Sequence, residues 1–163
     1  MALSCYDATA VRHFYQETRM KTKVAASVAV VCLGFSLAWS CASADNVSVF
    51  RLKVGDCISG ELDADKVSRV DCGLPHHFET FHVHKAAGSE YPGEDILETM
   101  AEKACIGAFK GYVGVPFESS SLAFDYLVPS KWSWVTKKDR DILCFITSVD
   151  DEPITGSAKG SGR

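Results

Sequence analysis

One short segment of the chain is unusually rich in side chains that bind metals or transfer protons. Residues 70–85, VDCGLPHHFETFHVHK, hold one cysteine and four histidines. His82 and His84 are two positions apart, so on a strand they share a face with Cα atoms roughly 6.6 Å apart. A structural zinc site needs four protein ligands and a catalytic one about three. We therefore predict no cofactor and no metal site. The alternative is weak binding of a metal ion at the surface by His82 and His84.

His76 and Glu79 lie in the same segment, just after the bend expected at Pro75. A functional interpretation makes them an acid–base pair or a polar contact for a ligand. The structural interpretation, which we favour, has them bonding backbone at the bend or pairing with Arg140. In a regular strand Glu79 points to the face opposite His82. The two would then not share a site.

Other signs of catalysis are weak. The chain has no G-x-S-x-G elbow for a nucleophilic serine. It also lacks a glycine-rich phosphate loop after a strand. We predict that the protein is not an enzyme. The weakest alternative is a hydrolase that combines His76 and Glu79 with an acid such as Asp139.

Two tryptophans, Trp132 and Trp134, form a second candidate binding feature. They stand beside lysines in the segment KWSWVTKKDRD, which reads as a loop or short helical turn. Exposed aromatic side chains can stack on sugars or anchor a partner protein. The alternative, which we favour, is that one or both pack against the sheet.

Four of the seven cysteines fall in the main part of the chain, and their even number predicts two disulfides. Cys57 and Cys72 flank a turn-rich connection and can meet across neighbouring strands. Cys105 falls in a predicted helix and Cys144 in a late strand, so that pair would join helix to sheet. A four-cysteine zinc site is disfavoured because close C-x-x-C pairs are missing.

The N-terminal part predicts export. Residues 20–44 have two lysines, an apolar run and small residues before Ala44, as in a signal peptide or an uncleaved signal anchor. Cleavage after Ala44 competes with lipidation at Cys41. Residues 1–19 are an upstream segment or follow a wrongly assigned start. Residues 150–163 are rich in glycine, serine and charge, which predicts a flexible tail.

The elements between these ends predict an α+β domain over residues 47–149, with one main helix packed on a mostly antiparallel sheet. Apolar residues recur at helical spacing after Pro92 and Gly93, and Gly111 and Gly114 end that pattern. The net charge of −4, without a basic stripe, argues against nucleic-acid binding. The segments that predict strands are 49–58, 66–72, 78–86, 121–130 and 141–149.

Several motifs together resemble the septum formation-related domain family of actinobacteria. They are LKVGDC, VDCGLPHHFETF, YPGEDIL, a helix cysteine, YVGVPFESSSL, VPSKWSW, DRDILCFI and TGSAKG, which span about residues 52–160. His77, His82 and His84 depart from the family pattern. The resemblance implies a non-catalytic, exported or membrane-anchored envelope domain, linked by the family's label to septation. We expect it to bind an envelope protein or a cell-wall component; histidine-dependent metal or ligand binding is the alternative.

Overall fold

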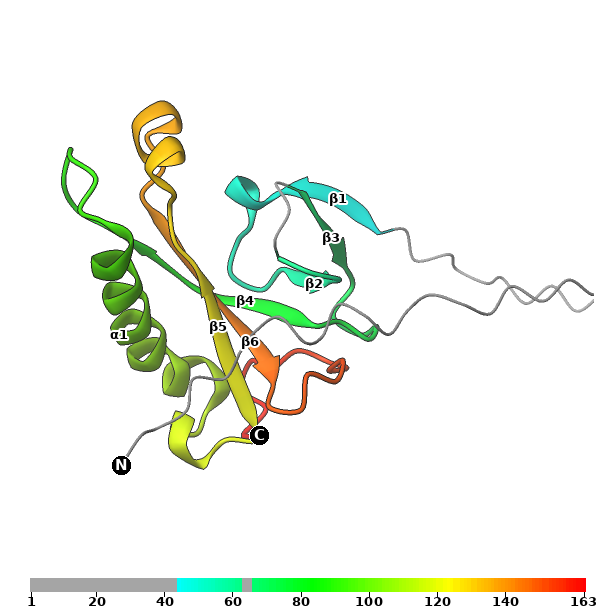
Figure 1. The fold of residues 1–163 in the computed structure, drawn as a ribbon. Coiled ribbons are helices and arrows are strands. Elements are labelled where there is room, and N and C mark those ends of the chain that lie inside the picture. Colours follow the sequence, from blue (N-terminus) through cyan, green and yellow to red (C-terminus); the bar gives the residue numbers. More distant parts are fainter. Residues whose placement is uncertain (1–43, 63–65) are drawn as a thin grey trace, which may run out of the picture. The chain divides into compact units, whose positions relative to one another are not determined.

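The computed structural model describes residues 44–62 and 66–163. The predicted upstream segment, most of the predicted signal and Cys41 lie outside the described residues. Six strands form one antiparallel sheet in the order β1-β3-β2-β4-β6-β5, and one long helix accompanies it (Figure 1). The predicted fold class is confirmed. The elements are β1 (Asp45–Ser48), η1 (Val49–Arg51), β2 (Cys57–Ser59), β3 (Lys66–Val70), β4 (Phe78–Lys85), α1 (Glu94–Val113), η2 (Phe117–Ser119), β5 (Leu122–Leu127), η3 (Ser133–Lys137) and β6 (Asp141–Ser148).

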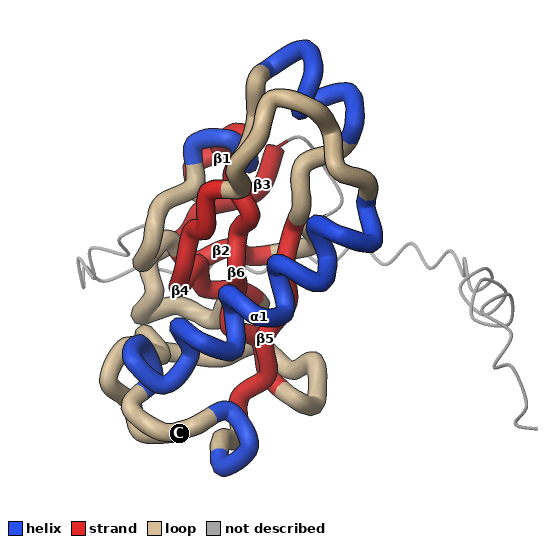
Figure 2. The backbone as a smooth tube through the Cα atoms, turned by 90° about the vertical axis from the view of Figure 1, so that its left-hand side faces the viewer, coloured by secondary structure: helices blue, strands red, loops and turns tan. Residues whose placement is uncertain are grey.

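Helix α1 begins and ends where the sequence predicts. Gly93 precedes it with φ of 108°, and Glu94 and Asp95 in the first turn suit the positive end of the helix dipole. Gly114 ends it in the left-handed conformation, which glycine adopts without steric cost. The helix crosses the strands β4, β6 and β5 (Figure 2). Its buried side chains are those of Leu97, Ala101, Cys105, Phe109, Tyr112 and Val113.

The sheet is apolar on both faces. The helix side is filled by two clusters, one around Phe81 and Phe109 and one around Leu97 and Trp134. A third cluster, around Ile58 and Phe145, lies on the other face, where η1 and the loop after β2 contribute side chains. The helix therefore covers only one face of the central strands. Among the described residues, no helix combines the length and apolar content needed to cross a bilayer.

The first predicted strand, 49–58, is not continuous. The chain instead forms β1, the short 3-10 helix η1 and a turn at Gly55 before it reaches β2. The polar residues of β1 pair with β3, and Arg69 bonds Asp45 at 2.9 Å. A four-residue polar strand has no apolar alternation, which is why the sequence did not predict it.

A bulge in β4 changes which side chains share a face. The register shifts between Thr80 and His82, so Glu79 lies opposite Ile146 and His82 lies opposite Cys144. Directly opposed residues share a face, and two residues of β6 that are two apart share one too. Glu79 and His82 therefore both face α1, and the expectation of opposite faces is wrong.

The C-terminal segment is packed rather than flexible. Ile154 is 7% exposed and Ala158 is fully buried. The amides of Gly160 and Gly162 donate to the carbonyls of Tyr112 and Val113, at 2.8 and 2.9 Å. These are carbonyls that a helix end leaves without internal partners. The predicted tail is wrong because small residues, read as signs of flexibility, here allow close backbone approach.

Candidate functional site

Both predicted disulfides are present with the predicted pairing. Cys105 of α1 bonds Cys144 of β6 with Cα atoms 5.6 Å apart, and both residues are fully buried. Cys57 of β2 bonds Cys72, which follows β3, with Cα atoms 5.3 Å apart. Cys57 is 1% exposed, whereas Cys72 is half-buried. The second disulfide therefore includes one cysteine that is not fully buried.

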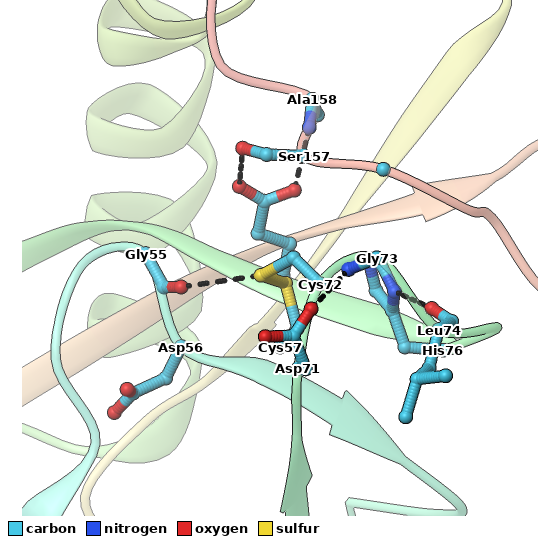
Figure 3. Close-up of a disulfide and its surroundings, with 12 residues drawn as sticks. Gly55, Asp56, Cys57, Asp71, Cys72, Gly73, Leu74, His76, Ser157 and Ala158 are labelled. Carbon is cyan, nitrogen blue, oxygen red and sulfur yellow. Dashed lines mark hydrogen bonds between the residues drawn. A yellow bond between two sulfur atoms is a disulfide. The ribbon is translucent and has the colours of Figure 1, made fainter. Parts of the chain in front are cut away.

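A buried polar cluster surrounds the Cys57–Cys72 disulfide. Ser157 and Ala158 of the C-terminal segment and His76 gather about it (Figure 3). Glu79 lies opposite Cys57 on β4. The atoms that Cys57, His76 and Glu79 offer as ligands lie within 4.8 Å of one another, and all three residues are buried. We call these three residues the buried cluster.

Glu79 is fully buried and has three hydrogen-bond donors. The hydroxyl of Tyr112 donates at 2.7 Å, the amide of Ala158 at 2.6 Å and the hydroxyl of Ser157 at 2.5 Å. Burial, followed by the bond to the Glu79 carboxylate, raises the pKa of Tyr112 above its usual value, so its hydroxyl remains a donor. A buried carboxylate is tolerated only with such partners.

His76 is fully buried and bonds the chain at the bend. Its Nδ1 lies 2.8 Å from the carbonyl oxygen of Leu74. A carbonyl only accepts, so this contact assigns the proton to Nδ1. Its Nε2 is buried without a hydrogen-bond partner. The favoured interpretation of backbone bonding agrees with this geometry.

The other predicted partners of His76 and Glu79 lie elsewhere. Arg140 donates to the carbonyls of Gly88, Trp134 and Asp139 and bonds neither residue. Asp139 accepts from Ser133 and from the amide of Asp141. Asp141, two residues after Asp139, pairs with Lys85 at one end of β4, whereas Glu79 lies near the other end of that strand. The structure does not bring Asp139 to the buried cluster.

His82 and His84 lie side by side at the helix side of β4. Their ring centroids are 6.4 Å apart, and both line a shallow depression with Met100, Lys103 and Ala104. Burial, with the charge of His84 second, lowers the pKa of His82. Within the described residues, no third ligand-type side chain joins them. Weak metal binding by this pair stays a prediction.

The two tryptophans have different environments. Trp134 is fully buried, donates to the carbonyl of Ser89 at 3.1 Å and stacks on the guanidinium of Arg140, 3.6 Å from the ring centroid. This burial agrees with the favoured alternative, in which one or both tryptophans pack against the sheet, and it removes Trp134 from the candidate binding residues. Trp132 is 59% exposed, and Lys137 lies 5.5 Å from its ring centroid.

Trp132 lines a groove on the face away from α1, which we call the aromatic groove. Its volume is about 320 Å³, and Phe50, which is 48% exposed, lines it too. An adjoining depression of about 580 Å³ shares both aromatic residues and adds basic side chains. The apolar lining comes from Val49, Leu52, Leu62, Leu127, Val128 and Leu143. The basic lining comes from Lys66, Lys85, Lys137, Lys138 and Arg140.

A sequence model described as septum formation matches residues 54–162, two thirds of the chain and nearly all of the described part. The chain belongs to the septum formation family. The match includes all four bridged cysteines, the buried cluster and the C-terminal segment that contacts it. The resemblance inferred from the sequence motifs is thereby confirmed.

Two mycobacterial relatives of this septum formation domain are named "Putative lipoprotein LppN". They come from Mycobacterium tuberculosis and Mycobacterium bovis, and each is 25% identical over 123 residues. The aligned part covers 72% of this chain and 67% of each relative. No solved structure matches the chain.

Sequence reasoning missed several residues of this septum formation domain. Tyr112, Ser157 and Ala158 hold Glu79, and Phe50 lines the aromatic groove. One signal was available for the first group, since the motif TGSAKG at residues 155–160 was part of the family resemblance. A motif inside a domain's pattern argues against a flexible tail. No comparable pattern pointed to Phe50.

Proposed function

We propose that this chain is a non-catalytic, exported domain of the cell envelope that binds an acidic, extended segment of an envelope protein in the aromatic groove. The observation that carries the proposal is the pair of exposed aromatic side chains, Phe50 and Trp132, on one groove with a basic rim. Aromatic anchors in such pockets dominate many protein interfaces.

Export is supported by the cysteine chemistry and by the relatives' name. Two disulfides are typical of proteins in oxidising compartments and rare in the cytosol. The relatives are named as lipoproteins. We propose that residues 20–44 direct the export and that they anchor the chain, are cleaved after Ala44, or end in lipidation at Cys41. Mass spectrometry of the N-terminus of cell-purified protein distinguishes the three.

The lining of the groove favours a peptide over a sugar polymer. Six of its twelve lining residues are leucines and valines, from η1 and the residues after it, the loop after β2, β5 and β6. Four are polar, namely Ser130, Ser133, Asp139 and Asp141. Apolar side chains of a bound segment gain free energy by leaving water there, at about 25 cal/mol per Å². Sugars would instead need flat aromatic platforms with many polar groups.

The charge of the rim favours an acidic segment. Lys66, Lys137 and Lys138 are exposed at the groove, although the chain as a whole is acidic. Lys85 and Arg140 are already engaged, the first with Asp141 and the second with backbone carbonyls. Asp139 and Asp141 also line the groove, but Ser133 bonds the first and Lys85 pairs with the second. Three exposed lysines beside an apolar groove complement carboxylates that flank apolar residues, and salt should weaken the contact.

The absence of catalysis is part of the proposal. His76 and Glu79, the pair that the sequence offered for acid–base chemistry, are fully buried, and the C-terminal segment bonds both residues. A substrate would have to displace that segment to reach them. This burial supports a positioning role for both residues in the folded domain.

A photo-crosslinking amino acid at position 132 tests the groove directly in living cells. A matched control carries the same amino acid at Ile106, which is 44% exposed on α1. We expect one defined adduct at position 132, absent at position 106, whose cross-linked peptide is acidic. Adduct formation should fall in the variant Lys137→Glu/Lys138→Glu. Equal adducts at both positions, or none at either, would contradict the proposal.

The cell-wall alternative and the division role need separate tests. The domain should not co-sediment with purified, insoluble cell-wall material. Co-sedimentation that the variant Trp132→Ala abolishes would mean that the groove binds wall polymer instead. For the division role, a fluorescent fusion should concentrate at the septum and disperse in Trp132→Ala. Uniform distribution of the unaltered fusion would contradict a septal role while leaving the binding groove intact.

A further inference from the structure

The buried cluster has the composition of a metal site in which one ligand is blocked. Cys57, His76 and Glu79 offer sulfur, nitrogen and oxygen within 4.8 Å, and the sulfur is tied to Cys72. We propose that reduction of the Cys57–Cys72 disulfide converts the buried cluster into a Zn²⁺ site with these three residues as ligands. This inference is independent of the aromatic groove.

The ligand set suits zinc. Thiolate, imidazole and carboxylate are the three side-chain types that bind Zn²⁺ in proteins. Three protein ligands with a fourth position for water is the arrangement of an open zinc site. A disulfide sulfur is a poor ligand, because the ion needs the negatively charged thiolate. Reduction therefore supplies the missing ligand without any change of sequence.

His76 shows the clearest sign of a missing partner. Its Nε2 is buried without a hydrogen bond, although buried polar atoms nearly always have one. Its Nδ1 bonds the Leu74 carbonyl at 2.8 Å. Histidines that bind metals almost always donate their other ring N–H to a carbonyl or carboxylate, which fixes the ring. The ring is thus already held as a ligand would be.

Glu79 is oriented in the same manner. Tyr112, Ser157 and Ala158 bond its two oxygens from α1 and from the C-terminal segment. Oε1 accepts from both Tyr112 and Ser157, whereas Oε2 accepts from Ala158 alone, so Oε2 keeps a lone pair for an ion. Carboxylates that bind metals are commonly supported in this way.

The different burial of the two cysteines sets the direction of reduction. The thiolate of an external dithiol attacks the Sγ of Cys72, the less buried cysteine, and the Cys57–Cys72 bond breaks. Cys57 leaves as a thiolate beside His76. The second thiol of the reductant, as its thiolate, then attacks the mixed disulfide and releases the Cys72 thiolate. The reductant becomes a disulfide, and the protein has gained two electrons.

After reduction, the two freed cysteines have different partners. The Cys72 sulfur lies 3.5 Å from the carbonyl oxygen of Gly55 (Figure 3). The oxidised sulfur carries no hydrogen, but after the Cys72 thiolate takes a proton it can donate one to this carbonyl. Cys57 is left as the thiolate that binds Zn²⁺. Cys105–Cys144 is fully buried and keeps helix and sheet joined meanwhile.

The variant Cys72→Ala tests the site without a reductant, because it leaves Cys57 unpaired. We expect the dialysed variant to hold one Zn²⁺ per chain by elemental analysis, and oxidised unaltered protein to hold none. Co²⁺ in place of Zn²⁺ should give the charge-transfer band of a thiolate ligand. In Cys72→Ala/His76→Ala the affinity should fall at least about tenfold, the loss seen even for residues that only support a ligand. The control Cys72→Ala/His82→Ala/His84→Ala should keep the metal.

A second measurement uses the unaltered sequence in case Cys72→Ala does not fold. The protein is treated with a dithiol, freed of it and alkylated with or without Zn²⁺. We expect Zn²⁺ to protect Cys57 from alkylation and to leave Cys72 reactive. Absence of both uptake and protection would overturn the proposal. So would uptake that survives loss of His76 or disappears with His82 and His84.

Discussion

The two disulfides lie on the same face of one sheet but under different covers. Cys144 and Cys57 both point to the helix side, since the register places them opposite His82 and Glu79. Above Cys105–Cys144 lies the apolar packing of α1, with Phe81, Phe109 and Ile146 nearby. Beside Cys57–Cys72 lie the polar side chains of His76 and Glu79, and the C-terminal segment.

The difference shows that a disulfide's surroundings decide what else it can do. Both cysteines of Cys105–Cys144 are fully buried in a mostly apolar cluster, so that disulfide only braces the fold. The surroundings of Cys57–Cys72 combine one half-buried cysteine with titratable side chains. Burial in an apolar cluster and burial in a hydrogen-bonded cluster look alike in exposed area and differ in chemistry.

Removing each disulfide in turn gives the largest expected effect. In the chain-entropy model, Cys105→Ala/Cys144→Ala costs roughly 4 kcal/mol and Cys57→Ala/Cys72→Ala roughly 3 kcal/mol, for separations of 39 and 15 residues. The free energy of unfolding from guanidinium titration measures both. The order should hold under identical buffer and temperature. A larger loss for the shorter loop would mean that the polar cover contributes more than the apolar one.

Replacing Glu79 with glutamine sharpens the comparison on the polar side. The amide nitrogen of glutamine would meet donors where the carboxylate accepts, so the free energy of unfolding should fall by about 2 kcal/mol, the value typical of hydrogen bonds to a charged group. Hydrogen exchange should also become faster at the amides of residues 156–162. Glu118→Gln, at an exposed position, serves as the control and should change neither quantity. Unchanged exchange in Glu79→Gln would show that the segment is held by other contacts.

The smallest expected effect is the pH dependence of stability that arises from His82, beside α1. His82 has a lowered pKa in the folded state, with His84 and Lys103 facing it. The unfolded chain then binds a proton more readily, so stability is full above the unfolded pKa of 6.5 and decreases as the pH falls below it. The unfolding midpoint should drop between about pH 7.5 and about pH 5.5. His82→Gln should reduce this drop, and an unaltered drop would assign it to other groups.

The sequence predicts the surroundings of Cys105–Cys144 better than it predicts the polar surroundings of Cys57–Cys72. The helix follows from apolar spacing and glycine stops, and the pairing of Cys105 with Cys144 follows from a helix and a strand that must pack. The buried cluster depends on a bulge at Thr80–His82 and on the backbone of residues 154–162. Neither leaves a periodic pattern. Burying Glu79 also contradicts its polarity, and only distant donors at Tyr112 and Ala158 make it favourable.

The hydrogen bond from Ala158 to Glu79 also sets an order of events during biosynthesis. The two residues are 79 positions apart, so the amide is made long after the carboxylate has left the ribosome. A nascent chain that stalls before Ala158 would enclose an acid with too few donors. Closure of this part of the domain therefore requires residues up to Ala158, and chains shortened before that residue should be cleaved more readily by proteases.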